Sequence, residues 1–327
     1  MDPFDRELSA QPPFISEATF AGSLFIKDAE SLQRLKPDAV VLGVPLEWGE
    51  CSAGQSKGPR TIRSQSVHMG SYMHHVELEH SPFELLRIGD YGDVPGVSRS
   101  DVEGDFCRTT EKVLDILKAG AKPVVIGGDH SITYAILRAY SQHYSGDIGL
   151  IHFDAHIDVL DKWGCEDYSC ASWVRRAFEE FPNLKGENYT MVGARGFWPD
   201  RGDVGWMRDN GLKVLTMIDV DTLGIDACVD LALKRAFDGT DVVYLSFDGD
   251  AIDPAYAPAL GLPTPGGLTS REAIRAMRAI MRRGVHGLDL VEMTPYQENE
   301  AHTTSFLAVT LLMEALCGMA MSSEQGN

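Results

Sequence analysis

The sequence predicts an α/β fold: a single three-layer α/β/α domain built on an eight-stranded parallel sheet. Eight short apolar runs, rich in β-branched residues and bounded by Gly, Asp or Pro, are typical of strands buried on both faces. Amphipathic segments separate many of them, as crossover helices of a parallel sheet require. The 327 residues contain no internal repeat and no long linker, so we expect one domain over 1–327, with 1–35 as an N-terminal extension.

The predicted strands are spread over most of the chain. They are Ala39–Val44, Leu85–Ile88, Pro123–Ile126, Ile148–Phe153, Tyr189–Gly193, Lys213–Ile218, Val242–Phe247 and Gly287–Val291. The clearest helices are Asp101–Leu117, Ser131–Tyr140, Ala171–Phe181 and Ser270–Arg283. Eight strands also suit a closed β/α barrel, but the link from Ile88 to Pro123 holds one helix and a long loop, which favours an open sheet. Functional side chains should then follow the carboxyl ends of the strands.

Charge and composition narrow the classes of partner. With 29 Lys and Arg against 48 Asp and Glu, the net charge is −19, which repels nucleic acid and favours a small cationic partner. The longest apolar stretch, Ser305–Met321, carries Glu314 and is predicted as a buried helix, so no membrane span is expected. The acidic start, Met1–Glu7, does not resemble a signal peptide. Six scattered cysteines indicate neither a disulfide framework nor a structural zinc site, and we expect a cytoplasmic protein.

Acidic and imidazole side chains cluster after three of the predicted strands. The segments are Gly127–Ser131 (Gly-Gly-Asp-His-Ser), Asp154–Asp158 (Asp-Ala-His-Ile-Asp) and Asp248–Pro254 (Asp-Gly-Asp-Ala-Ile-Asp-Pro). Because side chains alternate in an extended chain, Asp154, His156 and Asp158 point to one side. Asp248 and Asp250 share a side for the same reason. If the three segments are neighbours, four carboxylates and two imidazoles, the second being that of His130, meet at one place.

Four carboxylates at close range need compensation. Each ionised pair at ~4 Å costs about 4 kcal/mol at an effective dielectric near 20. Protons relieve this, and so do two divalent cations, whose charge balances the four carboxylates. Oxygen and imidazole donors without thiolate suit Mn²⁺, Ni²⁺, Fe²⁺, Co²⁺ or Zn²⁺. Two such ions ~3.5–4 Å apart would bind a bridging water and lower its pKa, giving a hydrolytic hydroxide.

Single aspartates in these segments also have simpler interpretations. Asp129 is placed to cap a helix that starts at Ser131. Asp253, directly before Pro254, is typical of a turn. The repeated pattern at several strand ends, rather than any one residue, therefore carries the metal hypothesis.

The three segments resemble the metal-binding motifs of the ureohydrolase family, which includes arginase, agmatinase and guanidinobutyrase. Further matches fall in family order at Gly43–Pro45, Gly58–Arg63, Gly89–Val94, Val192–Gly196 and Leu288–Glu292, so the resemblance covers about 40–316. It implies an arginase-like fold and hydrolysis of a C–N bond of a guanidino compound, releasing urea or a substituted urea. It also implies trimers or hexamers, as homo- or hetero-oligomers.

The resemblance implies two metal ions, Mn²⁺ or Ni²⁺, that share bridging carboxylates. One ion would be held by His130, Asp154, Asp158 and Asp248, and the other by Asp154, His156, Asp248 and Asp250. Asp158 is expected to be catalytic as well as a ligand. Glu292 matches the carboxylate that grips the substrate guanidinium, which pairs bidentately and places its central carbon over the hydroxide. A local ion pair is the simpler interpretation of Glu292.

Cys170 departs from the family pattern. Aligned on Arg175-Arg176-Ala177, it occupies the position of a family histidine that takes part in proton transfer. A thiol is a poor proton shuttle near pH 7 because its reference pKa is higher. Either the shuttle is dispensable, or another group such as Asp161 takes part, or the chain is a weak or regulatory subunit of a hetero-oligomer. A thiol that merely fills space is equally compatible.

A second departure affects the substrate pocket. Ala259–Pro263 reads Ala-Leu-Gly-Leu-Pro where the family commonly has Gly/Ala-Thr-Gly-Thr-Pro, so Leu260 and Leu262 replace two hydroxyl side chains. Three tryptophans also follow strand-end motifs, namely Trp48, Trp163 and Trp173. These residues predict an apolar pocket, with Trp173 and Leu260 as candidate substrate contacts, and they suit an agmatinase-like branch that hydrolyses guanidine or biguanides. Zinc-dependent deacetylases share the general fold but typically keep one metal site, which argues against a deacylase.

Overall fold

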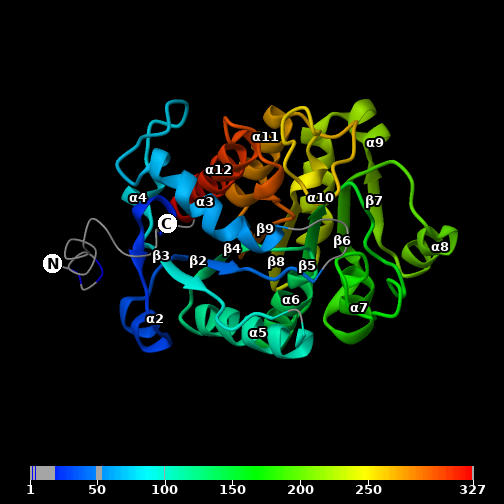
Figure 1. The fold of residues 1–327 in the computed structure, drawn as a ribbon, viewed down its shortest axis with the longest axis horizontal. Coiled ribbons are helices and arrows are strands. Elements are labelled where there is room, and N and C mark those ends of the chain that lie inside the picture. Colours follow the sequence, from blue (N-terminus) through cyan, green and yellow to red (C-terminus); the bar gives the residue numbers. More distant parts are fainter. Residues whose placement is uncertain (1, 3, 5–18, 49–53, 99, 326–327) are drawn as a thin grey trace.

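The computed structural model describes residues 2, 4, 19–48, 54–98 and 100–325. Nine strands form one parallel sheet in the order β1-β3-β2-β4-β9-β8-β5-β6-β7, so β1 and β7 are its edges and the sheet is open, as predicted (Figure 1). The strands are β1 (Leu24–Phe25), β2 (Ala39–Val44), β3 (Ile88–Asp93), β4 (Lys122–Gly127), β5 (Ile148–Phe153), β6 (Leu184–Ala194), β7 (Lys213–Thr216), β8 (Val242–Asp248) and β9 (Leu288–Val291). The additional strand is β1, which pairs with β3 and is too short to show a period.

Three predicted strands differ clearly from the observed ones. The predicted strand Tyr189–Gly193 is only the second half of β6, which begins at Leu184. The other two differ because helix caps begin beside them. The predicted strand Leu85–Ile88 was placed too early: a capping box of Ser81 and Glu84 starts the short helix α4 (Pro82–Leu85), and β3 begins only at Ile88. The predicted strand over 213–218 was too long. Thr216 and Asp219 form a second capping box, which ends β7 and starts α9 (Met217–Leu223).

The four clearest helix predictions are confirmed within a few residues. They correspond to α5 (Val102–Lys118), α6 (Ile132–His143), α7 (Trp173–Glu180) and α11 (Ser270–Arg282). Side chains fix their starts where the sequence offers a cap: Asp101 accepts a hydrogen bond from Gly104 N, and Thr269 forms a capping box with Glu272.

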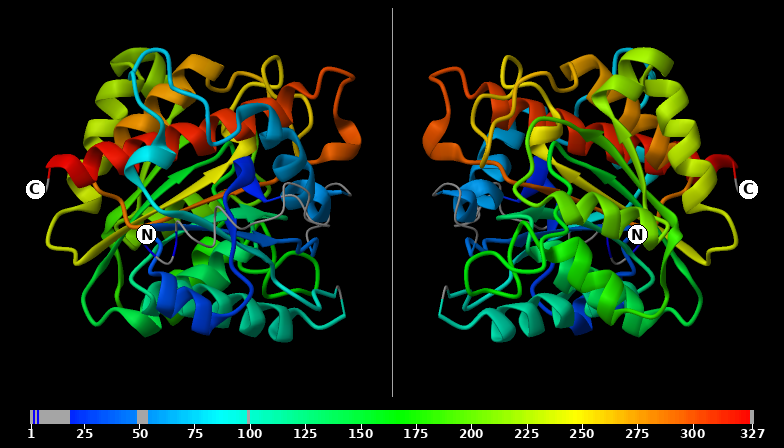
Figure 2. Two further views of the ribbon diagram at one scale, coloured as in Figure 1. Left: turned by 90° about the vertical axis from the view of Figure 1, so that its left-hand side faces the viewer. Right: turned by 90° about the vertical axis from the view of Figure 1, so that its right-hand side faces the viewer.

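Helices cover both faces of the sheet, and the side views show the strands between two helical layers (Figure 2). One layer holds α2 (Ala29–Leu35), α5, α6 and α7, and the other holds α3 (Gly58–Ser66), α10 (Ile225–Ala236), α11 and α12 (Thr303–Gln325). A short helix, α8 (Arg201–Asp209), lies near the β7 edge. Each layer closes a hydrophobic core against the sheet.

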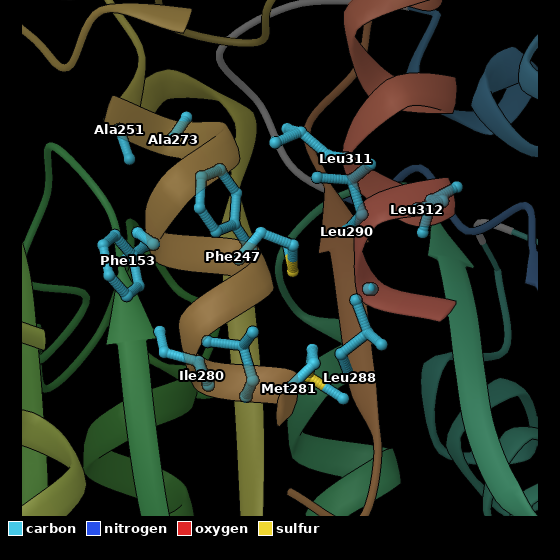
Figure 3. Close-up of a cluster of buried hydrophobic side chains, with 14 of the residues drawn as sticks. Phe153, Phe247, Ala251, Ala273, Ile280, Met281, Leu288, Leu290, Leu311 and Leu312 are labelled. Atoms are coloured by element: carbon cyan, nitrogen blue, oxygen red, sulfur yellow. The ribbon is translucent and has the colours of Figure 1, made fainter. Parts of the chain in front are cut away.

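The core beneath α11 and α12 supports the centre of the sheet (Figure 3). The rings of Phe153 on β5 and Phe247 on β8 stack with centroids 5.2 Å apart, and Leu290 of β9 lies beside them. Because both rings precede the acidic segments directly, their packing fixes where those segments leave the sheet.

Helix α12 contains the apolar stretch of the sequence. Its segment Thr303–Ser322 is long and apolar enough to cross a membrane, but 78% of its apolar stretch is buried inside the protein. In this structure it is a core helix, which agrees with the predicted buried helix. Glu314 within it is also buried, and it accepts hydrogen bonds from Arg278 of α11.

The strand order brings distant parts of the chain together. β4 and β5 follow one another in sequence, but β9 and β8 lie between them in the sheet. The carboxyl ends of these four central strands are therefore adjacent, and they carry the three acidic segments and Glu292.

Candidate metal centre

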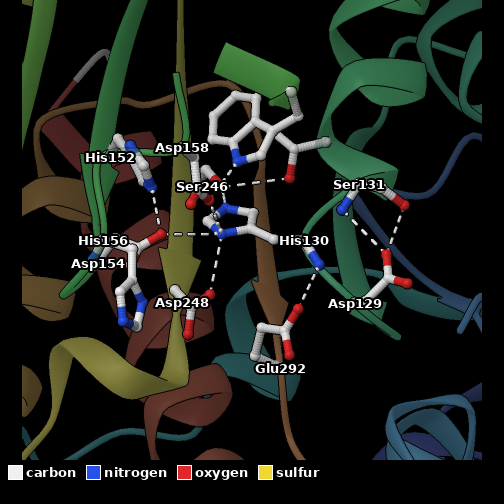
Figure 4. A network of polar contacts seen from close by, with 12 residues as sticks. Asp129, His130, Ser131, His152, Asp154, His156, Asp158, Ser246, Asp248 and Glu292 are labelled. Atoms are coloured by element: carbon white, nitrogen blue, oxygen red, sulfur yellow. Dashed lines mark hydrogen bonds and ion pairs between the residues drawn. The ribbon is translucent and has the colours of Figure 1, made fainter. Parts of the chain in front are cut away.

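The six predicted ligands lie within one cluster at these strand ends. Figure 4 labels all of them except Asp250. The Nδ1 atom of His130 lies 3.0 Å from Asp154 Oδ2 and 2.9 Å from Asp248 Oδ2. Its distance to Asp158 Oδ2 is 3.2 Å. On the other side of Asp154, the Nδ1 atom of His156 lies 2.9 Å from Asp250 Oδ2 and 3.5 Å from Asp154 Oδ1. Asp154 thus stands between the two imidazoles.

The hydrogen bonds around His130 leave a lone pair pointing at carboxylates. Its Nε2 atom lies 2.9 Å from the hydroxyl of Ser246, which donates its own proton to Asp289 at 2.8 Å. Ser246 therefore accepts from Nε2–H, and Nδ1 carries the lone pair. Nδ1 is buried and has no hydrogen-bond partner among the described residues. A lone pair facing three anionic oxygens is repulsive unless a cation lies between them, so this donor set fits a divalent metal ion.

The acids of the cluster cannot all ionise without such a cation. Burial, and then the charge of Asp154, raise the pKa of Asp158 to about 7. Burial, Asp250 and Asp154 hold the pKa of Asp248 well above its usual value. Burial opposes a charge on His130, but the carboxylates of Asp154, Asp158 and Asp248 beside it hold the pKa of this imidazole well above its usual value. The cluster therefore takes up protons when no metal is bound.

His152 belongs to the cluster, although it was not among the predicted site residues. Its Nε2 atom lies 2.9 Å from Asp154 Oδ2, and its Nδ1 atom 2.8 Å from the hydroxyl of Tyr189 on β6. Burial lowers the pKa of His152 to about 4, so the ring is neutral. The alternation along β5 contained the signal, because residues 152 and 154 share a side of the strand. Nothing in the sequence indicated the contact with Tyr189.

A cavity of about 390 Å³ opens onto the cluster. The lining residues with imidazole or carboxyl groups are His130, His156, Asp158, Asp248, Asp250 and Glu292. Its other lining residues are Gln55, Trp163, Cys170, Ala171, Phe197, Trp198, Pro199 and Leu262. Gln55, Phe197 and Trp198 were not predicted, because they lie in loops, where no periodicity indicates which way a side chain faces.

Glu292 is held in a strained position facing this cavity. Its Oε1 atom accepts from His130 N at 2.8 Å, and its Oε2 atom accepts from Gln55 Nε2 at 3.1 Å. Burial, and then the charge of Asp129, raise its pKa to about 8. Glu292 (φ +63°) and Asp158 (φ +49°) both adopt the left-handed conformation that non-glycine residues avoid. Such outliers cluster at functional sites, which agrees with the expected roles of both residues.

Gly261 makes room for this carboxylate. A Cβ atom at this position would lie 2.0 Å from Glu292 Oε2, and its backbone N donates to the Glu292 carbonyl at 2.9 Å. Any larger residue would therefore displace Glu292.

Trp173 and Leu260, the two predicted substrate contacts, lie elsewhere than expected. Trp173 is 1% exposed and donates from Nε1 to Asp158 Oδ2 at 2.9 Å, with its ring 4.8 Å from that of His130. Leu260 is fully buried and lies against Gly249. Neither is among the described residues that line the cavity, whereas Leu262 is. Trp173 packs behind the predicted ligands because it opens helix α7, which turns its ring under the β5 segment.

The other residues considered for the site divide into cavity and structural positions. Cys170 lines the cavity and is half-buried. Asp161 is mostly exposed and pairs with Arg176 at 2.7 Å, outside the lining. Asp253 accepts from Ala255 N at 2.9 Å, which is the predicted turn role. Asp129 accepts from Ser131 N at 3.0 Å, but the predicted cap role is wrong, because α6 begins at Ile132 with Ser131 as its N-cap. Of the three predicted pocket tryptophans, Trp163 is in the lining, and Trp48 instead donates from Nε1 to Tyr168 O at 2.9 Å.

Comparison with known proteins agrees with this geometry. The profile of the arginase family matches residues 37–318. A guanidinobutyrase from Pseudomonas aeruginosa is 36% identical over 282 residues, covering 86% of each chain. A guanidinopropionase from the same organism is 33% identical over 314 residues, covering 95% of this chain and 94% of the relative. The solved structure of a hypothetical agmatinase from Burkholderia thailandensis superposes with a TM-score of 0.82 at 27% identity, covering 96% of this chain and 93% of the other. The chain therefore belongs to the arginase family, the ureohydrolases that its motifs resemble.

Proposed function

We propose that this amidinohydrolase cleaves a C–N bond of a small cationic guanidino compound by attack of water and releases urea or a substituted urea. The observation that carries the proposal is the gathering of three buried carboxylates around the lone pair of His130 and of a fourth, Asp250, at His156, beside a cavity that also presents Glu292. His130, Asp154, Asp158 and Asp248 would hold one divalent ion, and Asp154, His156, Asp248 and Asp250 the other. When bound, two such ions supply Lewis acidity, which lowers the pKa of a water and stabilises developing negative charge.

The residues of the chain bind and orient the substrate. Glu292 accepts N–H bonds from the guanidinium, and the cationic substrate favours its ionised form despite burial. The amide of Gln55 and the backbone N–H of His130 fix both oxygens of Glu292, so the bound guanidinium has one orientation over the acidic cluster. Trp173 and His152 hold Asp158 and Asp154 in place by hydrogen bonds.

We propose Mn²⁺ or Ni²⁺ as the ions. Carboxylate oxygen and imidazole nitrogen are the donors at the cluster, and these suit first-row divalent ions. For the substrate we propose an agmatine-like compound, guanidine or a biguanide, because apolar side chains form much of the lining. The relatives named above are a guanidinobutyrase and a guanidinopropionase, which supports the guanidino group as the shared feature.

Metal analysis combined with a substrate panel tests the proposal. Protein loaded with Mn²⁺ or Ni²⁺ should contain two ions per chain and release urea or a substituted urea from at least one of arginine, agmatine, guanidinobutyrate, guanidine and biguanides. Protein that binds fewer than two ions, or that is inert towards the whole panel with both metals, contradicts it. A Glu292→Gln variant that keeps two ions but loses turnover would assign the guanidinium contact to Glu292.

A second candidate is a weakly active or regulatory subunit of a hetero-oligomeric ureohydrolase. The observation in its favour is Cys170, a thiol that lines the cavity at the position of the family's proton-transfer histidine. Cys170→His would then raise turnover without changing the binding of a partner chain. Strong turnover by the wild-type chain alone would exclude this candidate.

We also propose that the chain forms trimers or hexamers and acts in the cytoplasm. The resemblance to the family supports oligomers, as do the largely exposed side chains of Tyr72 and Val76 in one loop. Cys107, Cys165, Cys228 and Cys317 are free thiols, which suits a reducing compartment. Sedimentation of the purified chain and microscopy of the tagged protein test these two points.

A further inference from the structure

Three of the residues that line the cavity are aromatic. Trp163 comes from the loop after β5, and Phe197 and Trp198 come from the loop after β6. We call these three residues the aromatic wall. Trp198 is fixed because its Nε1 atom donates to Asp203 Oδ2 of α8 at 2.7 Å, and its ring lies 6.4 Å from that of His156. One member of the aromatic wall, Trp198, therefore lies beside a predicted metal ligand.

Two of the apolar residues that line the cavity are exposed to solvent. Phe197 is 102% exposed although it lines the cavity, and Leu262, from the loop after β8, is 46% exposed. Large apolar side chains that gather at a cavity in this way commonly mark a ligand contact. A ligand that covers them gains free energy by removing apolar surface from water.

The charges around the cavity are one-sided. Among the described lining residues the carboxyl groups are Asp158, Asp248, Asp250 and Glu292, and there is neither lysine nor arginine. A substrate with a carboxylate tail would bring that anion into the cavity without a lysine or arginine to pair with it, which is costly.

We propose that the aromatic wall and Leu262 form a subsite for an uncharged N-alkyl substituent of the guanidino substrate. The chain then prefers N-alkylguanidines and N-alkylbiguanides over guanidino acids of similar length. Apolar contact supplies the gain, and the faces of the tryptophan rings also attract the adjacent cation. This inference rests on the proposed function, since it assigns the tail of a substrate whose guanidinium binds Glu292.

Three substrates test it on the metal-loaded full chain: guanidine, N-butylguanidine and 3-guanidinopropionate. We expect kcat/KM for N-butylguanidine to exceed that for 3-guanidinopropionate by about a hundredfold or more. Phe197→Ala and Trp163→Ala should each lower the ratio of kcat/KM for N-butylguanidine to that for guanidine by about tenfold. Tyr72→Ala is the matched control, because this ring is 78% exposed but lies outside the lining, and its ratio should stay at the wild-type value.

A gain of function makes the test stricter. Leu262→Arg places a cation in the lining, so turnover of 3-guanidinopropionate relative to N-butylguanidine should rise by about tenfold or more. A wild-type preference for the guanidino acid would overturn the proposal. Ratios that neither Phe197→Ala nor Trp163→Ala changes would overturn it as well.

A binding measurement separates this inference from the proposed function. Calorimetry with metal-loaded protein should show N-butylguanidinium binding about tenfold more tightly than guanidinium, and Phe197→Ala should reduce that advantage. If the chain binds with this preference but turns over no guanidino compound, the proposed function fails and the subsite stands. Equal affinity for the two cations would refute the subsite even in an active enzyme.

Discussion

Two groups of acids lie towards the carboxyl edge of the sheet, and they are neutralised in different ways. At β3, Asp90 is paired with Arg63 of α3, with Nε 2.8 Å from Oδ2 and the terminal NH2 nitrogen 3.0 Å from Oδ1. Asp93 pairs with the same guanidinium. At β4, β5 and β8, four acids face imidazoles and one another, with no lysine or arginine in the described lining of that cavity. Where the chain supplies its own cation, the acids are structural, whereas the group without one requires ions from solution.

The largest expected effect comes from removing one acid of the uncompensated group. Asp248→Asn should lower the metal content below two ions per chain. It should also reduce kcat on the order of 10³-fold, because several kcal/mol of transition-state stabilisation are lost. In a chelator the variant should melt closer to the wild type than it does with metal, because burial raises the pKa of Asp248 and so lowers the cost of losing its charge. Atomic absorption and calorimetry measure both. A variant that keeps two ions would contradict the assignment of Asp248 as a ligand.

The compensated group should respond in the opposite way. Asp90→Asn leaves the buried guanidinium of Arg63 with Asp93 as its one remaining acidic partner, and we expect the free energy of unfolding to fall by about 3 kcal/mol. Metal content per folded chain should stay at two. Arg275→Gln, which breaks the exposed pair with Asp226, is the control and should cost about 0–1 kcal/mol. Urea titrations with metal bound measure all three proteins.

Removing the ions sharpens the comparison without changing the sequence. At free metal of about 100 times Kd, each site stabilises the native state by about 2.7 kcal/mol, which a chelator abolishes. The melting temperature of the wild type and of Asp90→Asn should fall on chelation, and that of Asp248→Asn should fall less. Equal shifts in all three proteins would show that the ions bind elsewhere.

A third buried acid, Glu314 of α12, is compensated like Asp90 and gives the smallest effect. Burial opposes its charge, but Arg278 (Nε to Oε2, 2.6 Å) and His75 (Nε2 to Oε1, 2.9 Å) lower its pKa below 4.5. A lowered carboxyl pKa adds stability above pH 4.5, and this contribution is lost as the pH falls through the folded-state value. Glu314→Gln should therefore cost about 1.5–3 kcal/mol at pH 7, and less as the pH drops below 4.5. A cost independent of pH would mean that the carboxylate charge is not what matters.

Much of the fold and of the predicted ligand set followed from the sequence because both depend on short periods. Alternation along β5 and β8 placed the acids on one side, and the parallel topology placed those strand ends at one edge. The same alternation places His152 on the side of Asp154. His152 was not predicted as a site residue because it lies within the apolar run rather than after it. Strand β1 was not predicted because its two residues are too few to show a period. The ends of β3 and β7 were misplaced because side-chain hydrogen bonds of the capping boxes determine them.

The pocket was less predictable than the ligands. Leu260 and Leu262 are two residues apart on an irregular loop, yet the first packs inside and the second faces the cavity. Trp163 and Trp173 differ in the same way, because one lies in a loop and the other opens a helix. Loop geometry depends on the contacts of the whole fold, and residue spacing does not encode it.

The position of β8 and β9 between β4 and β5 also constrains when the site can exist during synthesis. A nascent chain that ends before residue 248 has His130 and the Asp154–Asp158 segment but lacks the strands that separate and align them. The last strand, β9, is completed only at Val291, next to Glu292. We therefore expect the ions to bind late, after nearly the whole polypeptide has left the ribosome. The first half of the chain cannot form the complete site before the second half has been made.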